Sequence, residues 1–287
     1  MSRKYVVLMC ILLILGSALI EASNTVVRYP RPETDFDKRS LYPTKLLQLA
    51  LDRVDKDYRL VASPLIMNQG RALIQLRKGV NVDVVWSMTS RERESNLRPI
   101  RIPIHKGLIG WRLFLINVRD RYNLERKLTL DLLQKYKFVQ GHDWPDADIL
   151  EAAGLTIFRS PAYSTIMNML DAGRFDAYPI GMNEVKGELD KRPSLNLIGE
   201  QSIVLSYLAP VFIFINLENM DLQASLKSGF DNIIRDGSFD KIFNSHYQGL
   251  VAKTKINQRK VFKLNNPGMS DTTREAMKNY SSMLIVR

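Results

Sequence analysis

Cysteine is almost absent, because Cys10 is the single cysteine among 287 residues. One cysteine rules out an intramolecular disulfide and a zinc site built on several thiolates. It lies in the middle of the apolar stretch 5–20, whereas a lipid-modified cysteine would stand at the end of such a stretch. We therefore expect a mature protein without a lipid anchor, a disulfide or thiol chemistry.

Histidine is also scarce, and His105, His142 and His246 are too scattered for a zinc site of the usual spacing. The sequence contains no glycine-rich phosphate loop and no Gly-x-Ser-x-Gly nucleophile turn. His142 precedes Asp143, and such a pair can act in general acid–base catalysis, although a helix-capping loop that lines a cleft is the simpler interpretation. We expect a protein that is not an enzyme and that needs no metal ion and no cofactor.

The longest hydrophobic run stands at the N-terminus. Arg3 and Lys4 precede the apolar stretch 5–20, and Ala22 follows it at a plausible cleavage position. This order is typical of a secretory signal peptide, which we assign to residues 1–22. An uncleaved membrane anchor is the alternative, but the apolar core is a little short for a bilayer span. We expect a periplasmic protein that is not lipidated.

A second apolar run, from Ile203 to Leu217, is interrupted by Ser206, Tyr207 and Pro210. It is too short and too polar to span a bilayer, and we interpret it as two strands that meet at the proline. The mature protein should therefore have no stable membrane insertion. We expect it to be a monomer.

Acidic residues are outnumbered: 41 Lys and Arg stand against 30 Asp and Glu, which gives a formal net charge of +11. Such a balance favours acidic partners, namely nucleic acid, anionic lipid or small anions. Nucleic acid fits poorly with export, and no helix–turn–helix, zinc-finger or aromatic RNA-binding signature is present. We therefore expect no nucleic-acid partner and favour a small-molecule ligand.

Helix and strand patterns alternate along the first hundred residues. The order is a strand at 25–29, an amphipathic helix at 42–54, a strand at 58–62, a helix that stops at Gly79 and a β-branched strand at 80–85. A β-α-β-α-β order predicts a mostly parallel sheet. The polar segment 87–93 follows the last of these strands as a loop, where ligands of open α/β sheets bind.

The same helix–glycine–strand unit recurs in the second half of the chain. A helix at 163–172 ends at Gly173, and a strand follows to Gly181. This repetition predicts two similar lobes, with residues 23–108 and 211–287 in lobe 1 and residues 109–210 in lobe 2. The glycines at 107 and 110 mark the segment 105–110 as a candidate hinge, and Pro210 marks the second crossing. The placement of the tail after residue 250 is not predicted.

Three motifs in order resemble those of the type II periplasmic solute-binding proteins of the amino-acid-binding family 3. They are Leu76-Arg-Lys-Gly-Val-Asn-Val-Asp83 with Ser90-Arg-Glu-Arg93, then Met169-Leu-Asp-Ala-Gly-Arg-Phe-Asp-Ala177, then Asp236-Gly-Ser-Phe-Asp-Lys-Ile242. The resemblance implies an α/β fold of two lobes, each a mostly parallel sheet flanked by helices, joined by a two-crossing hinge.

The same resemblance implies a function. A solute would be captured in the cleft between the lobes by hinge closure and passed to an ABC-type membrane transporter. A ligand-sensing module that acts on a membrane receptor is the alternative, and a dehydratase-like cleft enzyme is a further one.

The resemblance also implies which residues bind the ligand. Arg93 matches the family's arginine that holds the α-carboxylate, with Arg91 as the competing candidate. The family's acid that holds the α-ammonium maps to Gly181, and the nearest acid, Glu184, is expected on the following helix. The ligand is therefore expected to be an amino-acid-like molecule or an organic anion. The candidate ligand-binding residues are Arg93, Ser90, Thr89, Trp86, Tyr29, Arg31, Gln140, His142 and Gly181.

Overall fold

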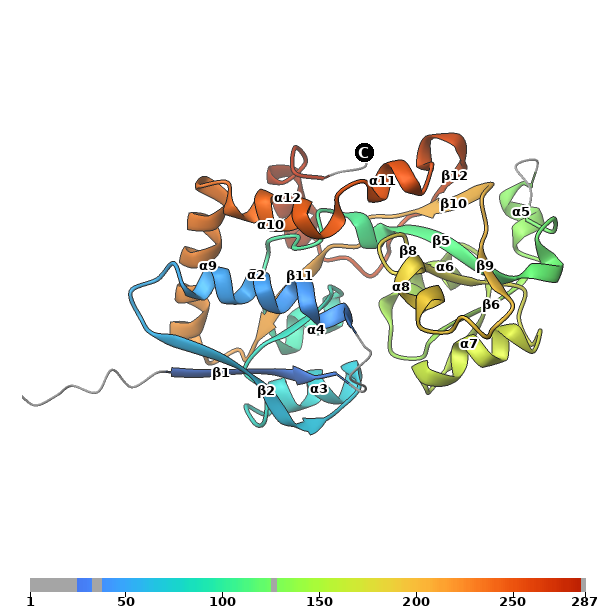
Figure 1. The fold of residues 1–287 in the computed structure, drawn as a ribbon. Helices are drawn as coiled ribbons and strands as arrows, with labels where there is room; N and C mark the ends of the chain where they lie inside the picture. The colour runs from blue at the N-terminus through green and yellow to red at the C-terminus, as the bar shows by residue number, and fades with distance from the viewer. Residues whose placement is uncertain (1–24, 33–37, 125–127, 285–287) are drawn as a thin grey trace, which may run out of the picture.

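Two lobes lie side by side in the computed structural model, which describes residues 25–32, 38–124 and 128–284 (Figure 1). The expected signal peptide, residues 1–22, lies outside these ranges. Within them, no helix has the length and apolar character needed to cross a membrane.

Lobe 1 contains most of the first hundred residues and two long helices from the second half of the chain. Its strands are β1 (Thr25–Arg31), β2 (Tyr58–Ile66), β3 (Val85–Met88), β4 (Arg98–Ile100) and β11 (Val211–Ile215). Its helices are η1 (Lys38–Ser40), α2 (Leu41–Leu51), α3 (Gln69–Arg77), α4 (Arg91–Asn96), α9 (Met220–Arg235), α10 (Ser238–Tyr247) and α12 (Asp271–Asn279). β1 and β2 pair in parallel, while β11 lies antiparallel between β3 and β4. The amide groups of Asp83 and Val84 donate to the carbonyl of Arg28, which joins the two parts of the sheet.

Lobe 2 is built around β5. Its strands are β5 (Trp111–Asn117), β6 (Lys137–Gly141), β7 (Thr156–Ser160), β8 (Tyr178–Gly181), β9 (Leu197–Gly199), β10 (Ile203–Ser206) and β12 (Lys260–Lys263). Its helices are η2 (Leu108–Gly110), η3 (Val118–Asp120), α5 (Leu130–Leu133), α6 (Pro145–Ala152), α7 (Tyr163–Asp171), α8 (Val185–Asp190), α11 (Leu250–Lys253) and η4 (Ile256–Gln258). β5 pairs antiparallel with β8, β9 and β10, and β12 extends the sheet in parallel with β10.

Local sequence explains the helix–glycine–strand units. α3 ends one residue before Lys78, and Gly79 follows with a φ of +67°, a value that side-chain-bearing residues rarely adopt. α7 ends in the same way, and Gly173 has a φ of +72°. Each left-handed glycine turns the chain from the helix back toward the sheet, as the sequence predicted.

The prediction of mostly parallel sheets is wrong, because five of the eight strand pairs among the described residues are antiparallel. Helical crossovers do make β1 parallel to β2, and β6 parallel to β7. However, β5 and β11 enter their lobes directly from the hinge and not through a helical crossover. A strand that enters in this way runs opposite to its neighbours, which gives the antiparallel pairs around β5 and β11.

The assignment of residues 211–287 to lobe 1 also needs correction. β11, α9 and α10 do return to lobe 1, but β12 then pairs with β10 in lobe 2. α12 returns again to lobe 1, where Met277 packs in one apolar cluster with Leu76 and Phe212. Within the described ranges, the chain therefore crosses between the lobes four times and not twice, through residues 101–110, 207–210, 248–258 and 264–268.

Candidate functional site: the interlobe cleft

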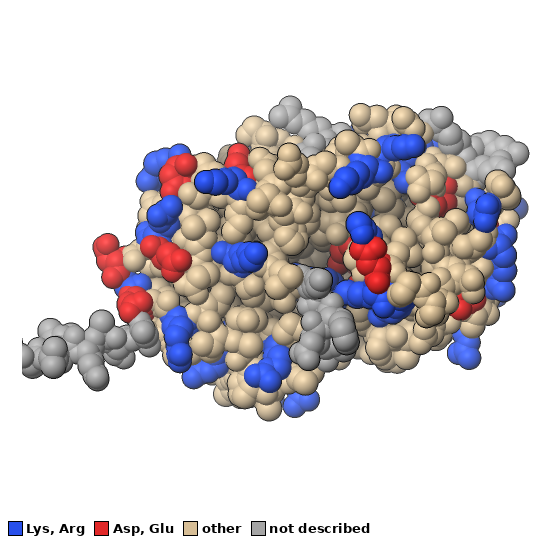
Figure 2. All heavy atoms as spheres, in the orientation of Figure 1, with Lys and Arg blue, Asp and Glu red and all other residues tan. Residues whose placement is uncertain are grey.

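A cleft of about 1080 Å³ separates the lobes and is lined by side chains from both. Figure 2 shows this hollow near the middle of the molecule, with acidic and basic side chains beside it. Lobe 1 contributes Arg31, Arg39, Asn68, Gln69, Arg71, Trp86 and Ser87. Lobe 2 and the hinge contribute His105, Arg112, His142, Asp143, Trp144, Asp146, Tyr163, Asn183, Glu184, Glu188 and Lys191, and Tyr247 lines the cleft from the end of α10.

Three of the predicted ligand-binding residues, Trp86, Arg31 and His142, line the cleft directly. Trp86 is half-buried, and its ring lies 6.0 Å from the ring of Tyr29, so Tyr29 supports the tryptophan from behind. The Arg31 side chain donates through Nε to the carbonyl of Ser63 at 2.9 Å.

The other predicted residues do not line the cleft directly. Thr89 is buried and donates through Oγ1 to Glu94. Gln140 is fully buried, and its amide nitrogen donates to the carbonyl of Pro179.

Arg93 belongs to helix α4 and not to a loop, and Ser90 caps that helix, which corrects the prediction for residues 87–93. The Ser90 side chain accepts from the Arg93 amide at 3.2 Å and so caps the helix. Acidic residues stand in the first turn, at Glu92 and Glu94, as favoured at a helix N-terminus. The Ser-x-x-Arg spacing thus places Arg93 on the first turn of a capped helix.

The Arg93 side chain joins the two lobes. Its Nη1 donates to Ser87 Oγ and to the Met88 carbonyl at 2.8 Å, both within lobe 1. Its Nη2 donates to Gln69 Oε1 at 3.2 Å and, across the cleft, to the Asp143 carbonyl at 2.8 Å. Burial lowers the pKa of Arg93 to about 10, so the guanidinium remains charged at neutral pH.

Glu184 occupies the space that a side chain at position 181 would fill. A Cβ built on Gly181 would meet Glu184 Oε2 at 2.7 Å, and the Gly181 amide donates to the same oxygen at 3.2 Å. The carboxylate of Glu184 thus reaches back from the N-terminus of α8 to the end of β8. Burial raises the pKa of Glu184 even though Arg112 opposes the shift.

A buried charged cluster at the base of the cleft was not predicted from the sequence. Arg112 in β5 is 3 % exposed and forms an ion pair with Asp146 on the first turn of α6. Tyr207 accepts from Arg112 Nε at 3.0 Å and donates to Asp146. Burial alone would lower the pKa of Arg112, but the neighbouring Asp146 outweighs it and raises this pKa. The cluster fixes β5 and α6 against the 207–210 crossing.

A second contact across the cleft involves Arg39, whose guanidinium carbon lies 4.2 Å from the centre of the Tyr163 ring. Arg39 comes from lobe 1 and Tyr163 from the first turn of α7 in lobe 2.

His142 and Asp143 approach to 3.9 Å, which is too long for a hydrogen bond. Among the described residues, no group of three or more histidine, cysteine, aspartate or glutamate side chains is arranged to hold a metal ion.

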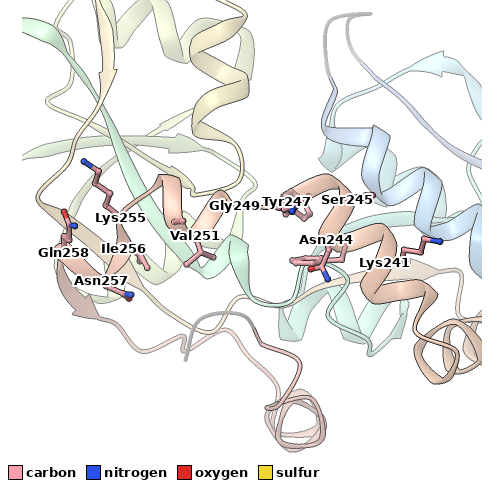
Figure 3. Close-up of a pocket in the computed structure, with 13 residues that line it drawn as sticks. Lys241, Asn244, Ser245, Tyr247, Gly249, Val251, Lys255, Ile256, Asn257 and Gln258 are labelled. Atoms are coloured by element: carbon pink, nitrogen blue, oxygen red, sulfur yellow. The ribbon is translucent and has the colours of Figure 1, made fainter.

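A further hollow, of about 1010 Å³, lies on the outer side of the hinge (Figure 3). Lys241, Asn244 and Tyr247 line it from α10, and Val251, Ile256 and Gln258 line it from the 248–258 crossing. This hollow lies between lobe 1 and the part of the chain that returns to lobe 2.

Comparison with known proteins identifies the fold. No family model matches the sequence, and no curated protein matches it either. Among solved structures, the chain is similar to an ancestral arginine-binding protein bound to arginine, with 14% identity and a TM-score of 0.59 over 78% of this chain and 99% of that one. It is also similar to a probable amino-acid ABC transporter extracellular-binding protein from Bacillus subtilis, with 16% identity and a TM-score of 0.57 over 78% and 97% of the two chains.

A third similar structure is a histidine kinase sensor domain that itself resembles periplasmic binding proteins. Its identity is 13% and its TM-score 0.57, over 79% of this chain and 96% of that one. Identities this low establish the fold alone. The chain therefore has the two-lobed α/β fold of type II periplasmic binding proteins, as its sequence motifs implied.

Proposed function

We propose that the chain captures a small carboxylate-bearing solute, amino-acid-like or an organic anion, between its lobes and has no catalytic role. The observation that carries this proposal is the distribution of charge in the cleft. The charged lining residues of lobe 1 are the arginines Arg31, Arg39 and Arg71. On lobe 2, acids outnumber bases: Asp143, Asp146, Glu184, Glu188 and Asp190 stand against Arg112 and Lys191. A ligand with a carboxylate toward lobe 1 and a hydrogen-bond donor toward lobe 2 complements both walls.

Arg93 is the proposed carboxylate anchor. Its Nη1 contacts with Ser87 and Met88 fix the orientation of the guanidinium within lobe 1. Its Nη2 faces Gln69 and Asp143, which both line the cleft. A ligand carboxylate would therefore bind Arg93 by replacing the acceptors at Nη2, while the contacts at Nη1 remain.

Glu184 is the proposed acceptor for an ammonium or other donor group of the ligand. Its carboxylate lies at the end of β8, and its distance of 3.8 Å from Arg112 Nη1 is too long for a hydrogen bond. The Gly181 amide holds one of its oxygens in place. An amino-acid-like ligand thus remains compatible with a glycine at position 181, because Glu184 supplies the acid from three residues away.

We further propose that the protein is exported through residues 1–22, acts in the periplasm and serves an ABC-type membrane transporter. The solved amino-acid-binding proteins of similar fold support this proposal. The sensor domain of similar fold supports a second candidate, a module that signals to a membrane receptor. The two roles differ in which membrane protein recognises the closed form.

A thermal-shift screen of amino acids and small organic acids tests ligand binding, because a ligand that binds the folded state raises the melting temperature. Small-angle scattering with any ligand so identified tests closure, since the particle should contract. Methylamine and acetate serve as controls that carry only one of the two groups. A screen without any shift would contradict the proposal, and a tight ligand that leaves the scattering unchanged would contradict hinge closure.

A further inference from the structure

The fourth crossing of the chain runs directly beside the second. The Leu264 amide donates to the Ser206 carbonyl at 2.8 Å, just after β12 ends its parallel pairing with β10. Two residues later, the buried Asn266 side chain donates through Nδ2 to the Leu208 carbonyl at 2.8 Å. The segment 264–268 therefore follows the 207–210 hinge crossing in the same direction, from lobe 2 to lobe 1.

The lobe 2 end of this segment is held firmly. β12 pairs with β10 along all four of its residues, 260–263. Immediately before β12, Arg259 is buried and donates through Nη1 to the Glu200 carbonyl at 2.6 Å. The Arg259 guanidinium also lies 3.6 Å from the Glu200 carboxylate.

The lobe 1 end is held by helix α4, which also carries Arg93. The Arg91 amide donates to the Gly268 carbonyl, and Arg91 Nη1 donates to the Pro267 carbonyl, both at 2.8 Å. On the same helix, Glu94 accepts from Ser270 Oγ at 2.8 Å and from Thr273 Oγ1 at 2.6 Å. The C-terminal segment is thus fixed to both lobes within a few residues.

We propose that the segment 264–268 is a strap that limits how far the lobes can open. Leu264 is bound to the end of β10, and Gly268 is bound to α4. Four peptide units between these anchors reach roughly 14 Å when fully extended, and Pro267 makes the segment stiffer. Opening beyond that reach must break the anchors at Asn266, Gly268 or Glu94.

The 248–258 crossing does not restrain the lobes in the same way. The hollow in Figure 3 separates its residues, such as Val251 and Gln258, from Tyr247 at the end of α10. This crossing is longer than the strap, and the hollow beside it leaves space into which the crossing can move. Of the two C-terminal crossings, the strap is therefore the one that limits opening, and the limit applies with or without a ligand in the cleft.

Distances between spin labels in the ligand-free protein test this proposal independently of the proposed function. Cysteines replace Ile74 on α3 and Asn168 on α7, which are both exposed, and Cys10→Ser removes the native thiol. Three glycines are inserted between Asn266 and Pro267 to lengthen the strap by roughly 10 Å while its anchors remain. The control carries the same insertion between the exposed residues Pro193 and Ser194.

We expect the strap insertion to lengthen and broaden the distance distribution by several ångströms, and the control insertion to leave it unchanged. Circular dichroism establishes that each variant is folded. If the strap insertion does not fold, the double substitution Asn266→Ala with Arg91→Ala replaces it, and a smaller change in the same direction is expected. A folded strap variant with the wild-type distribution would overturn the proposal.

Discussion

Replacing Arg93 with alanine tests the proposed anchor and its contact between the lobes together. The substitution removes four hydrogen bonds from a side chain that is almost fully buried. Gln69 and Asp143 are only half-buried, so their oxygens can bond to water instead, whereas Ser87 and Met88 are buried although they also line the cleft. A buried polar group left without a partner costs about 1–3 kcal/mol. We therefore expect Arg93→Ala to lower the free energy of unfolding by about 2–4 kcal/mol.

Ligand binding should weaken in the same variant. A charge-assisted contact from a guanidinium to a carboxylate contributes about 1.5–3 kcal/mol, which corresponds to a loss of roughly tenfold to a few hundredfold in affinity. Arg93→Lys should recover only part of the loss in stability and in affinity, because one ammonium group cannot reproduce the planar pair of donors of a guanidinium. Arg93 lies on α4 and not in a loop, so Arg93→Ala affects the stability of the fold as well as ligand binding.

Urea unfolding and calorimetry measure the two effects, and Arg91→Ala is the matched control. Arg91 is exposed and lies two residues before Arg93 on the same helix, and its side chain donates to one backbone carbonyl. Its loss should cost less than about 1 kcal/mol and change affinity less than threefold. If Arg91→Ala proves the damaging substitution and Arg93→Ala the silent one, the assignment of the anchor is wrong by two positions and the site must be rebuilt around Arg91.

Two further predictions concern buried groups at the base of the cleft. Asp146→Asn should lower the free energy of unfolding in urea by about 3–5 kcal/mol, because it leaves the Arg112 guanidinium buried without its main partner. The double variant Arg112→Met with Asp146→Leu should recover most of that loss. An Asp146→Asn variant as stable as the wild type would contradict this prediction. Burial lowers the pKa of His105 to about 3 from an ordinary 6.5. Between pH 6.5 and pH 3, His105 is therefore protonated in the unfolded chain but not in the folded one, so the free energy of unfolding falls as the pH falls. His105→Asn should remove a slope of about 1.4 kcal/mol per pH unit between pH 6.5 and 3, and equal slopes in variant and wild type would refute the assignment.

The parts of the fold that depend on neighbouring residues could be predicted from the sequence. Gly79 and Gly173 end their helices because each takes a left-handed conformation, and this requirement is local. The strands β10 and β11 meet near Pro210 as expected, because proline interrupts strand pairing. The cap at Ser90 was present in the sequence as well, since a serine followed by Glu92 and Glu94 is a helix-start signal.

Contacts between distant segments could not be predicted in this way. Arg112 pairs with Asp146 and Tyr207 across 34 and 95 positions, and nothing in the surrounding strand pattern distinguishes this arginine from an exposed one. The return of β12 to lobe 2 is a further example, because a strand of four residues does not indicate which sheet it joins. Glu184 belongs to the same group, since only the backbone path after β8 shows that its carboxylate reaches Gly181.

The contacts across the cleft constrain how a ligand can close the protein. A ligand shifts the balance between open and closed forms only by the difference in its affinity for the two. Arg93 Nη2 already bonds to the Asp143 carbonyl when the lobes touch, so a carboxylate that displaces this acceptor gains only the difference between the two bonds. The strap adds a second constraint, because a limited opening leaves less conformational freedom to lose on closure. A ligand of this cleft must therefore gain most of its preference for the closed form from lobe 2, where the Glu184 carboxylate at the end of β8 is the proposed acceptor.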